Sequence, residues 1–178
     1  QILSYSETKD LISCGQLSTR IRRISRDDSL WMTANLEKKH VKTELLEMIL
    51  SKGCKILNLS NSNILGSLSS NLKSQLIVLN LSRNLNGKWP SGAENFDVIE
   101  ELLSSCCSLQ HLAMEGLLLT SKMTVSICKN GKRLQTLNLK NSFENDSGCL
   151  IEIIGNCQEL KEVDLAYINS IIVANNRW

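Results

Sequence analysis

The chain has 178 residues, of which 42 % are apolar and only 4 % aromatic, so its core must consist mainly of aliphatic side chains in one domain, or in one domain with a small module beside it. The formal net charge of +2 is spread along the chain, which gives little support to a nucleic-acid partner. The sequence has no apolar run long enough to span a bilayer and no visible signal peptide, so we expect no membrane partner.

The first 35 residues predict a small helical module. Thr8 is placed to cap a helix that begins at Lys9. Apolar residues then recur at spacings of three and four, as in a helix with one apolar face: Leu11, Cys14, Leu17, Ile21 and Ile24.

A short phrase with the pattern L-x-x-L-x-L then occurs five times. Its middle positions are roughly 22 to 33 residues apart, which is typical of a leucine-rich repeat with one longer insertion. Each phrase predicts a short strand, and the middle positions are Leu57, Leu79, Leu112, Leu137 and Val163.

Helical patterns lie between most of these phrases. They cover residues 41–50, 98–103, 123–128 and 149–154, with Gly53, Gly131 and Gly155 following as stop signals. The segment 62–75 is rich in Ser and Asn and is expected to be irregular. Units of this kind bury their apolar faces only against their neighbours, so residues 36–170 predict an α/β solenoid of about five repeats, with the strands on its concave side.

Residues 171–178 are expected to be unstructured or to belong to an incomplete next repeat. No polar capping repeat follows the fifth phrase. We therefore expect either that the parent protein continues or that this end exposes an apolar face and associates.

Side chains alternate across a strand, so the residues between the leucines face outward. They are the predicted substrate-binding surface: Ile56, Asn58, Ser60, Val78, Asn80, Ser82, His111, Glu115, Thr136, Asn138, Lys140, Glu162 and Asp164. The row of Asn and Asp residues has two open interpretations, because stacked amides either bind a partner's backbone or bond to one another. Trp89, in a predicted loop at 86–95, is either a binding anchor or a side chain folded back onto the flank.

The seven cysteines form no paired C-x-x-C spacing. Cys54 stands at a leucine position of the first phrase, and Cys106 and Cys157 each precede a repeat leucine by three residues, so these three predict buried reduced thiols, hence a reducing compartment, cytoplasm or nucleus. We expect no metal and no cofactor. The two histidines form no catalytic constellation with Ser, Cys or Asp, so we do not expect an enzyme.

The N-terminal segment resembles an F-box. The resemblance is carried by Ile2-Leu-Ser-Tyr5, Lys9-Asp-Leu11, Arg20-Ile-Arg-Arg-Ile24 and Asp27-Asp-Ser-Leu-Trp31. An F-box over residues 1–35, followed directly by leucine-rich repeats, is similar to the F-box/leucine-rich-repeat family, and most similar to S-phase kinase-associated protein two and its relatives. The match begins in mid-helix at Gln1, so the F-box is expected to be truncated and the chain to be cut at both ends.

This resemblance implies a non-catalytic substrate receptor of an SCF-type (Skp–cullin–F-box) ubiquitin ligase, with a link to the cell cycle. It implies that the F-box binds the Skp adaptor, and through it a cullin–RING ligase, while the repeats hold a protein substrate. Leu30 and Trp31 would form the junction between F-box and repeats, and the adaptor-binding residues would be Leu3, Leu11, Ile12, Cys14 and Leu17. The alternative is a free-standing leucine-rich-repeat scaffold or inhibitor, in which residues 1–35 only cap the stack.

Overall fold

The protein is described by a computed structural model that covers residues 27–84, 96–144 and 148–170. Predictions that concern the rest of the chain lie outside these ranges. They include those for the helix at 9–24, for the loop residue Trp89, for residues 171–178, and for Leu3, Leu11, Ile12, Cys14 and Leu17.

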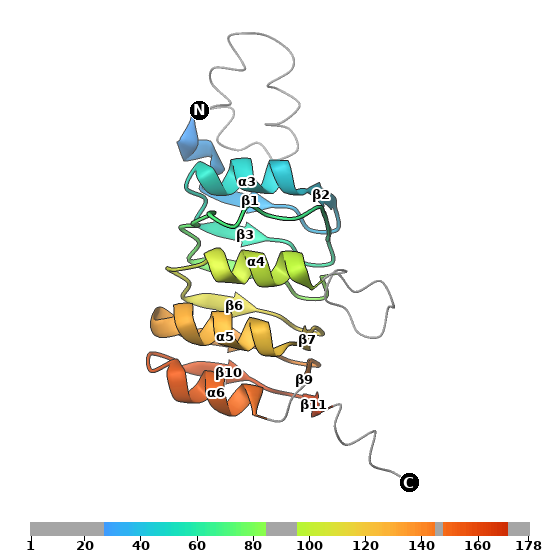
Figure 1. The fold of residues 1–178 in the computed structure, drawn as a ribbon, viewed down its shortest axis with the longest axis vertical. Coiled ribbons are helices and arrows are strands. Elements are labelled where there is room, and N and C mark those ends of the chain that lie inside the picture. The colour runs from blue at the N-terminus through green and yellow to red at the C-terminus, as the bar shows by residue number, and fades with distance from the viewer. Residues whose placement is uncertain (1–26, 85–95, 145–147, 171–178) are drawn as a thin grey trace.

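A six-stranded parallel sheet runs through the described chain (Figure 1). Its strands follow one another in sequence order, so each strand pairs only with the segment before it and the segment after it. Five of the strands coincide with the predicted phrases, whose middle residues lie side by side in register. The strands are β1 (Thr33–Asn35), β3 (Ile56–Asn58), β5 (Val78–Asn80), β6 (His111–Ala113), β8 (Thr136–Asn138) and β10 (Glu162–Asp164).

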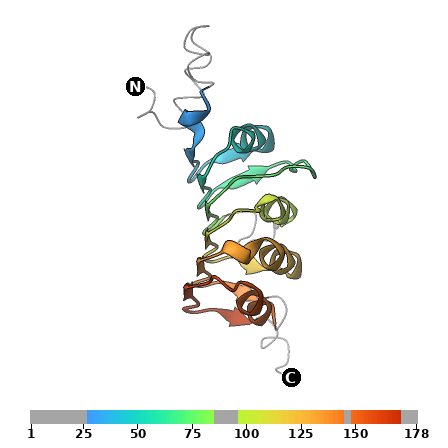
Figure 2. The same cartoon turned by 90° about the vertical axis from the view of Figure 1, so that its left-hand side faces the viewer.

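Four α-helices cover one face of this sheet and leave the other face open (Figure 2). They are α3 (Thr43–Ser51), α4 (Asp97–Ser105), α5 (Ser121–Asn130) and α6 (Cys149–Asn156), with short 3-10 helices η2 (Asp28–Trp31) and η3 (Gly131–Arg133). The helices expected at 98–103, 123–128 and 149–154 are confirmed. Within the described residues, no helix is both long enough and apolar enough to cross a membrane.

The helix expected at 41–50 begins two residues later, because Val41 belongs to the strand β2 (His40–Lys42). The side chain of Val41 is 1 % exposed, so this strand residue is as buried as the core residues of the helix that follows. In the sequence it therefore fits the apolar pattern of that helix. The segment 62–75 contains no helix, as predicted; it holds the strand β4 (Asn63–Leu65), which pairs with β2. Three more short strands form a third sheet: β7 (Leu118–Leu119), β9 (Phe143–Glu144) and β11 (Asn169–Ser170).

The leucine positions of the phrases form the core between the sheet and the helices. In the first four phrases every one of these side chains is at most 5 % exposed, and Leu57 and Leu79 are fully buried. Full burial of one such side chain contributes about 1.5–3 kcal/mol to stability. The repeated phrase therefore supplies most of the apolar surface that holds neighbouring strands and helices together.

The sheet begins earlier than the sequence predicts. Trp31, Ala34 and Leu36 occupy the same three core positions ahead of the first phrase, and they are 4 %, 1 % and 2 % exposed. Ala34 lies in register with Leu57, which makes β1 the first strand of the sheet. From the sequence, the repeats are expected to begin at residue 36. The earlier unit does not match the leucine pattern, because a large tryptophan beside a small alanine fills its core positions.

Candidate binding surface on the open face of the sheet

Two rows of outward side chains cross the open face, and strand pairing places them in register. The outer row starts at Thr33 and continues through Ile56, Val78, His111, Thr136 and Glu162. The asparagine row starts at Asn35 and continues through Asn58, Asn80, Ala113, Asn138 and Asp164. Sequence reasoning missed Thr33 and Asn35, since it did not detect β1. The signal was present as Trp31, Ala34 and Leu36 at the spacing of the later phrases.

The remaining residues of the predicted surface form a third row, where each strand leaves the sheet. They are Ser60, Ser82, Glu115 and Lys140. Backbone hydrogen bonds keep it in register, for example from Asn61 N to Ser82 O at 3.0 Å and from Gly116 N to Lys140 O at 2.9 Å. Ser60 is only 8 % exposed, so it offers a partner little surface. Glu115 is held by hydrogen bonds from Arg83 Nη2 at 2.8 Å and Asn141 Nδ2 at 3.4 Å. The bond from Arg83 is the main cause of a lowered pKa at Glu115.

The side-chain oxygens of the asparagine row hold the turns that end the strands. The Oδ1 atom of Asn58 accepts from Ser60 N at 3.0 Å, and that of Asn138 accepts from Lys140 N at 2.9 Å. Asn35, Asn80 and Asp164 make the same contact with the backbone N–H two residues later. This is the local turn that Asn and Asp side chains favour. One amide also bonds along the row, from Asn58 Nδ2 to Asn35 Oδ1 at 3.1 Å.

Of the two interpretations of this row, bonding within the protein therefore accounts for the side-chain oxygens. It does not account for all the side-chain nitrogens. Within the described part of the chain, neither Asn80 Nδ2 nor Asn138 Nδ2 donates a hydrogen bond to another residue.

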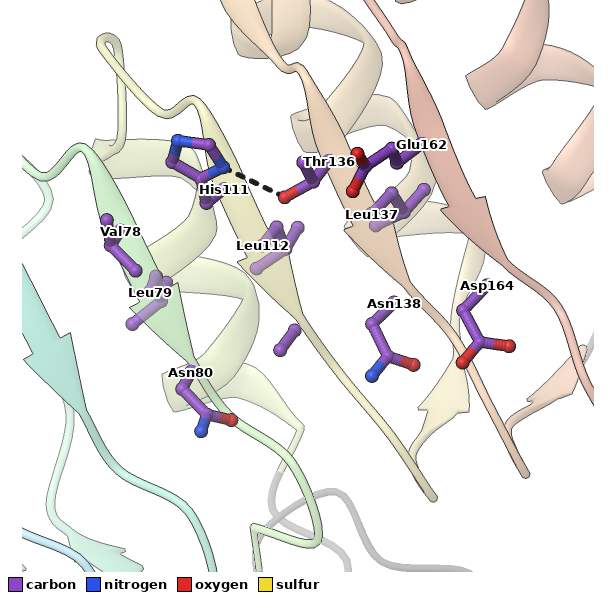
Figure 3. A pocket seen from close by; sticks show the side chains of 11 residues that line it. Val78, Leu79, Asn80, His111, Leu112, Thr136, Leu137, Asn138, Glu162 and Asp164 are labelled. Carbon is purple, nitrogen blue, oxygen red and sulfur yellow. Dashed lines mark hydrogen bonds between the residues drawn. The ribbon is translucent and has the colours of Figure 1, made fainter.

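Ala113 is the one member of the row without a polar side chain. In its place, the hydroxyl of Ser82 on the neighbouring strand accepts from Glu115 N at 3.3 Å, so the turn keeps a partner. A hollow of about 380 Å³ lies on the open face around this position. The hollow spans four strands and is lined by Val78, Leu79, Asn80, His111, Leu112, Ala113, Thr136, Leu137, Asn138, Glu162 and Asp164 (Figure 3).

His111 is half-buried in this lining, and its Nδ1 lies 2.9 Å from Thr136 Oγ1 (Figure 3). A contact across the strands therefore holds the ring of His111 within the predicted binding surface. The acidic lining residues are Glu162 and Asp164, and the lining contains His111 but no Lys or Arg. The hollow thus combines aliphatic side chains, amides and two carboxylates.

The described residues contain no group of three or more His, Cys, Asp or Glu side chains placed to hold a metal ion. The cysteines predicted to be core residues are buried: Cys54, Cys106 and Cys157 are at most 2 % exposed. Burial raises the pKa of the Cys54 and Cys106 thiols to about 11, so both stay protonated at neutral pH and are poor nucleophiles.

The predicted junction residues lie at the N-terminal edge of the sheet. Asp27 caps η2 by accepting from Ser29 N at 3.0 Å, and Asp28 forms an ion pair of 2.8 Å with Lys52 after α3. Leu30 is half-buried against the core, whereas Trp31 lies within it. The end of the N-terminal segment is therefore built into the sheet.

Comparison with protein-family models adds one finding. A family model described as F-box-like matches residues 1–37. The matched segment includes η2 and β1, so it overlaps the first unit of the sheet. The chain thus carries an F-box-like domain at its N-terminal end, joined to a mixed α/β domain with a parallel sheet.

Proposed function

We propose that the chain is the substrate-recognition subunit of an SCF-type ubiquitin ligase, with a leucine-rich-repeat solenoid as its receptor arm. The observation that carries the proposal is the F-box-like match at residues 1–37, which continues without a linker into the sheet. F-box domains generally bind the Skp adaptor. The open face of the sheet is the surface left for a protein substrate.

The proposed mechanism is proximity. A receptor that holds a substrate near a ubiquitin-charged enzyme raises the local concentration of target lysines, without chemistry of its own. This role requires no metal, cofactor or catalytic side chain in the chain. The cullin–RING components are proposed partners, reached through the adaptor. The buried thiols support a proposed location in the cytoplasm or nucleus.

The solenoid is supported by three features of the described chain. The strands follow sequence order, the helices share one face, and the same leucine positions are buried in successive units. Trp31 joins the F-box-like segment to this stack from within the core.

Pull-down with purified Skp adaptor tests the proposal. We expect the chain to retain the adaptor, and Leu11→Asp to abolish binding while the thermal unfolding of the sheet stays unchanged. Val125→Asp is the matched control, because Val125 is 60 % exposed on α5 and outside the F-box-like match. A second form, lengthened at its N-terminus by the first helix of an F-box protein, is tested in parallel. If neither form binds, the ligase role is wrong.

The second candidate is a free-standing leucine-rich-repeat scaffold or inhibitor. It is favoured by the way η2 and Trp31 cover the N-terminal edge of the sheet, since an open stack needs a cap. Lack of adaptor binding, together with a folded sheet, would support this candidate instead.

A further inference from the structure

We propose that the hollow at Ala113 binds the side chain of a lysine or arginine in a linear segment of a partner protein. The inference rests on the proposed function, in which that partner is the substrate. It adds the chemistry that the open face would select.

Of the six strand positions in the asparagine row, Ala113 has the smallest side chain. The other five strands carry Asn or Asp at the position that Ala113 occupies, and each of those side chains folds into its own turn. At Ala113 the Ser82 hydroxyl takes over the turn from the neighbouring strand, so the position stays open without loss of the hydrogen bond. The side chain of Val78 and the methyl group of Ala113 present apolar surface, which suits the aliphatic stem of a lysine or arginine.

The charge of the hollow selects a cation. Glu162 and Asp164 line one side, and the lining contains no Lys or Arg to neutralise them; its one histidine, His111, bonds to Thr136. Asp164 uses Oδ1 to accept from Ala166 N at 3.0 Å, which leaves Oδ2 for a ligand. The nearby Lys161 is directed to Gln135, with Nζ 3.4 Å from Oε1. Asp164 lies two strands from Ala113, which is about 9.5 Å at ordinary strand spacing, a distance that an extended basic side chain and one hydrogen bond can span.

The flanking amides suit an extended backbone. Asn80 and Asn138 lie on either side of Ala113, and their oxygens are already engaged with Ser82 N and Lys140 N. Their Nδ2 groups therefore remain as donors for the carbonyl groups of a bound segment. This arrangement combines two donors for the backbone with two carboxylates for one side chain (Figure 3).

The test uses the full chain and a display library of random 12-residue peptides. Peptides are selected on the wild-type protein and then measured individually, with free termini blocked, by fluorescence anisotropy. We expect the enriched peptides to share a lysine or arginine at one position, and replacement of that residue by glutamine to weaken binding about tenfold.

Three variants test whether the peptides bind at Ala113 and at the two carboxylates. Ala113→Asn adds side-chain atoms at a lining residue of the hollow and so narrows the space at this position, with the residue that neighbouring strands already carry; it is expected to fold normally and to lose about tenfold in affinity. Asp164→Asn keeps the turn acceptor and removes the charge; combined with Glu162→Gln, it is expected to cause a similar loss. Glu152→Gln is the charge control, because Glu152 is exposed on α6, on the helix side of the sheet.

Enriched peptides without a basic residue, or binding that Ala113→Asn leaves unchanged, would overturn the inference and leave the open face as a binding surface of other specificity. A library from which nothing is enriched would also contradict it. None of these three results affects adaptor binding by the F-box-like segment, which the pull-down measures separately.

Discussion

At the scale of single residues, the side chains of Asn80 and Asn138 in the asparagine row combine a structural oxygen with a nitrogen that is left for a partner. Each Asn or Asp oxygen holds a turn, and five of the six turns then place a residue other than glycine at positive φ: Lys38, Asn61, Arg83, Asn141 and Tyr167. Gly116 occupies the sixth turn, after Ala113. Positive φ is unfavourable for most L-residues, so the turn depends on the hydrogen bonds around it. The amide oxygen is therefore structural, and only the amide nitrogen is left for recognition.

Asn138→Ala should lower the free energy of unfolding by about 1 kcal/mol, because Lys140 N loses its acceptor in a partly buried turn. Asn138→Asp should be close to neutral, since Asp164 makes the same contact in the next strand. Urea denaturation followed by circular dichroism measures both. Equal stability of the alanine variant and the wild type would show that water replaces the amide at no cost.

At the scale of elements, the segment 66–75 replaces a helix in the layer between α3 and α4. Two carboxylates from those helices hold its backbone: Glu47 Oε1 accepts from Ser69 N at 2.7 Å, and Glu101 Oε2 accepts from Leu68 N at 2.6 Å. Leu68 is 6 % exposed, so it fills part of the space that a helix would cover. The composition of the segment predicted its irregularity, but the two glutamates that stabilise it come from distant segments.

The hydrogen bonds from Ser69 lower the pKa of Glu47 from its usual value of 4.5. A carboxyl group whose pKa falls on folding stabilises the folded state above its unfolded pKa, and loses that effect as the pH falls through the folded pKa. Glu47→Gln should therefore unfold at a lower temperature than the wild type at neutral pH, and the two should converge as the pH falls below the usual carboxyl pKa and Glu47 becomes protonated. Thermal unfolding across this range measures the difference. A constant gap at all pH values would contradict the assignment.

The first element of the sheet depends on Trp31. Trp31→Ala should destabilise the sheet by about 3–5 kcal/mol, because it removes a large buried side chain. Leu30→Ala is the matched control and should cost less, since Leu30 is only half-buried. Guanidinium unfolding of the full chain measures both variants. Similar losses would mean that Trp31 packs less tightly against the first unit than the structure indicates.

At the scale of the whole molecule, the two ends of the described sheet differ. At the N-terminal edge, η2 and Trp31 close the core. At the other edge, Val163 is 39 % exposed, although its counterparts in the other strands are at most 2 % exposed. Ile151 and Ile154 on α6 are 79 % and 52 % exposed. The described residues at this end thus present apolar surface to solvent, in line with one of the two sequence expectations.

Exposed apolar surface beside the edge strand β10 should make the chain self-associate as its concentration rises. Sedimentation velocity over a range of concentrations measures this effect. Ile151→Lys combined with Ile154→Lys should shift the chain towards monomer, whereas Val125→Lys on α5 should not. A chain that stays monomeric at all concentrations would contradict the prediction.

The sequence alone determined five strands, three of the four helices closely, and the register of the open face. It did so because the phrase repeats and because each unit contacts mainly its neighbours, so local periodicity carries most of the fold. The sequence also predicted the F-box-like character of the N-terminal segment, since that character depends on contiguous residues. The family match confirms it.

Only the tertiary structure decided features that depend on contacts between units. It placed Trp31, at the end of η2, and Ala34, in β1, in the core of the first unit, where the volume of the side chains is matched and not the residue type. It also showed that Ser142 Oγ donates to Met114 O at 2.8 Å, across one unit, and that Ser82 supports the turn after Ala113. Ser82 gives that support from the turn after the neighbouring strand β5. A single sequence does not reveal these contacts, since residues 28 and 33 positions apart carry no periodic signal of their bonds.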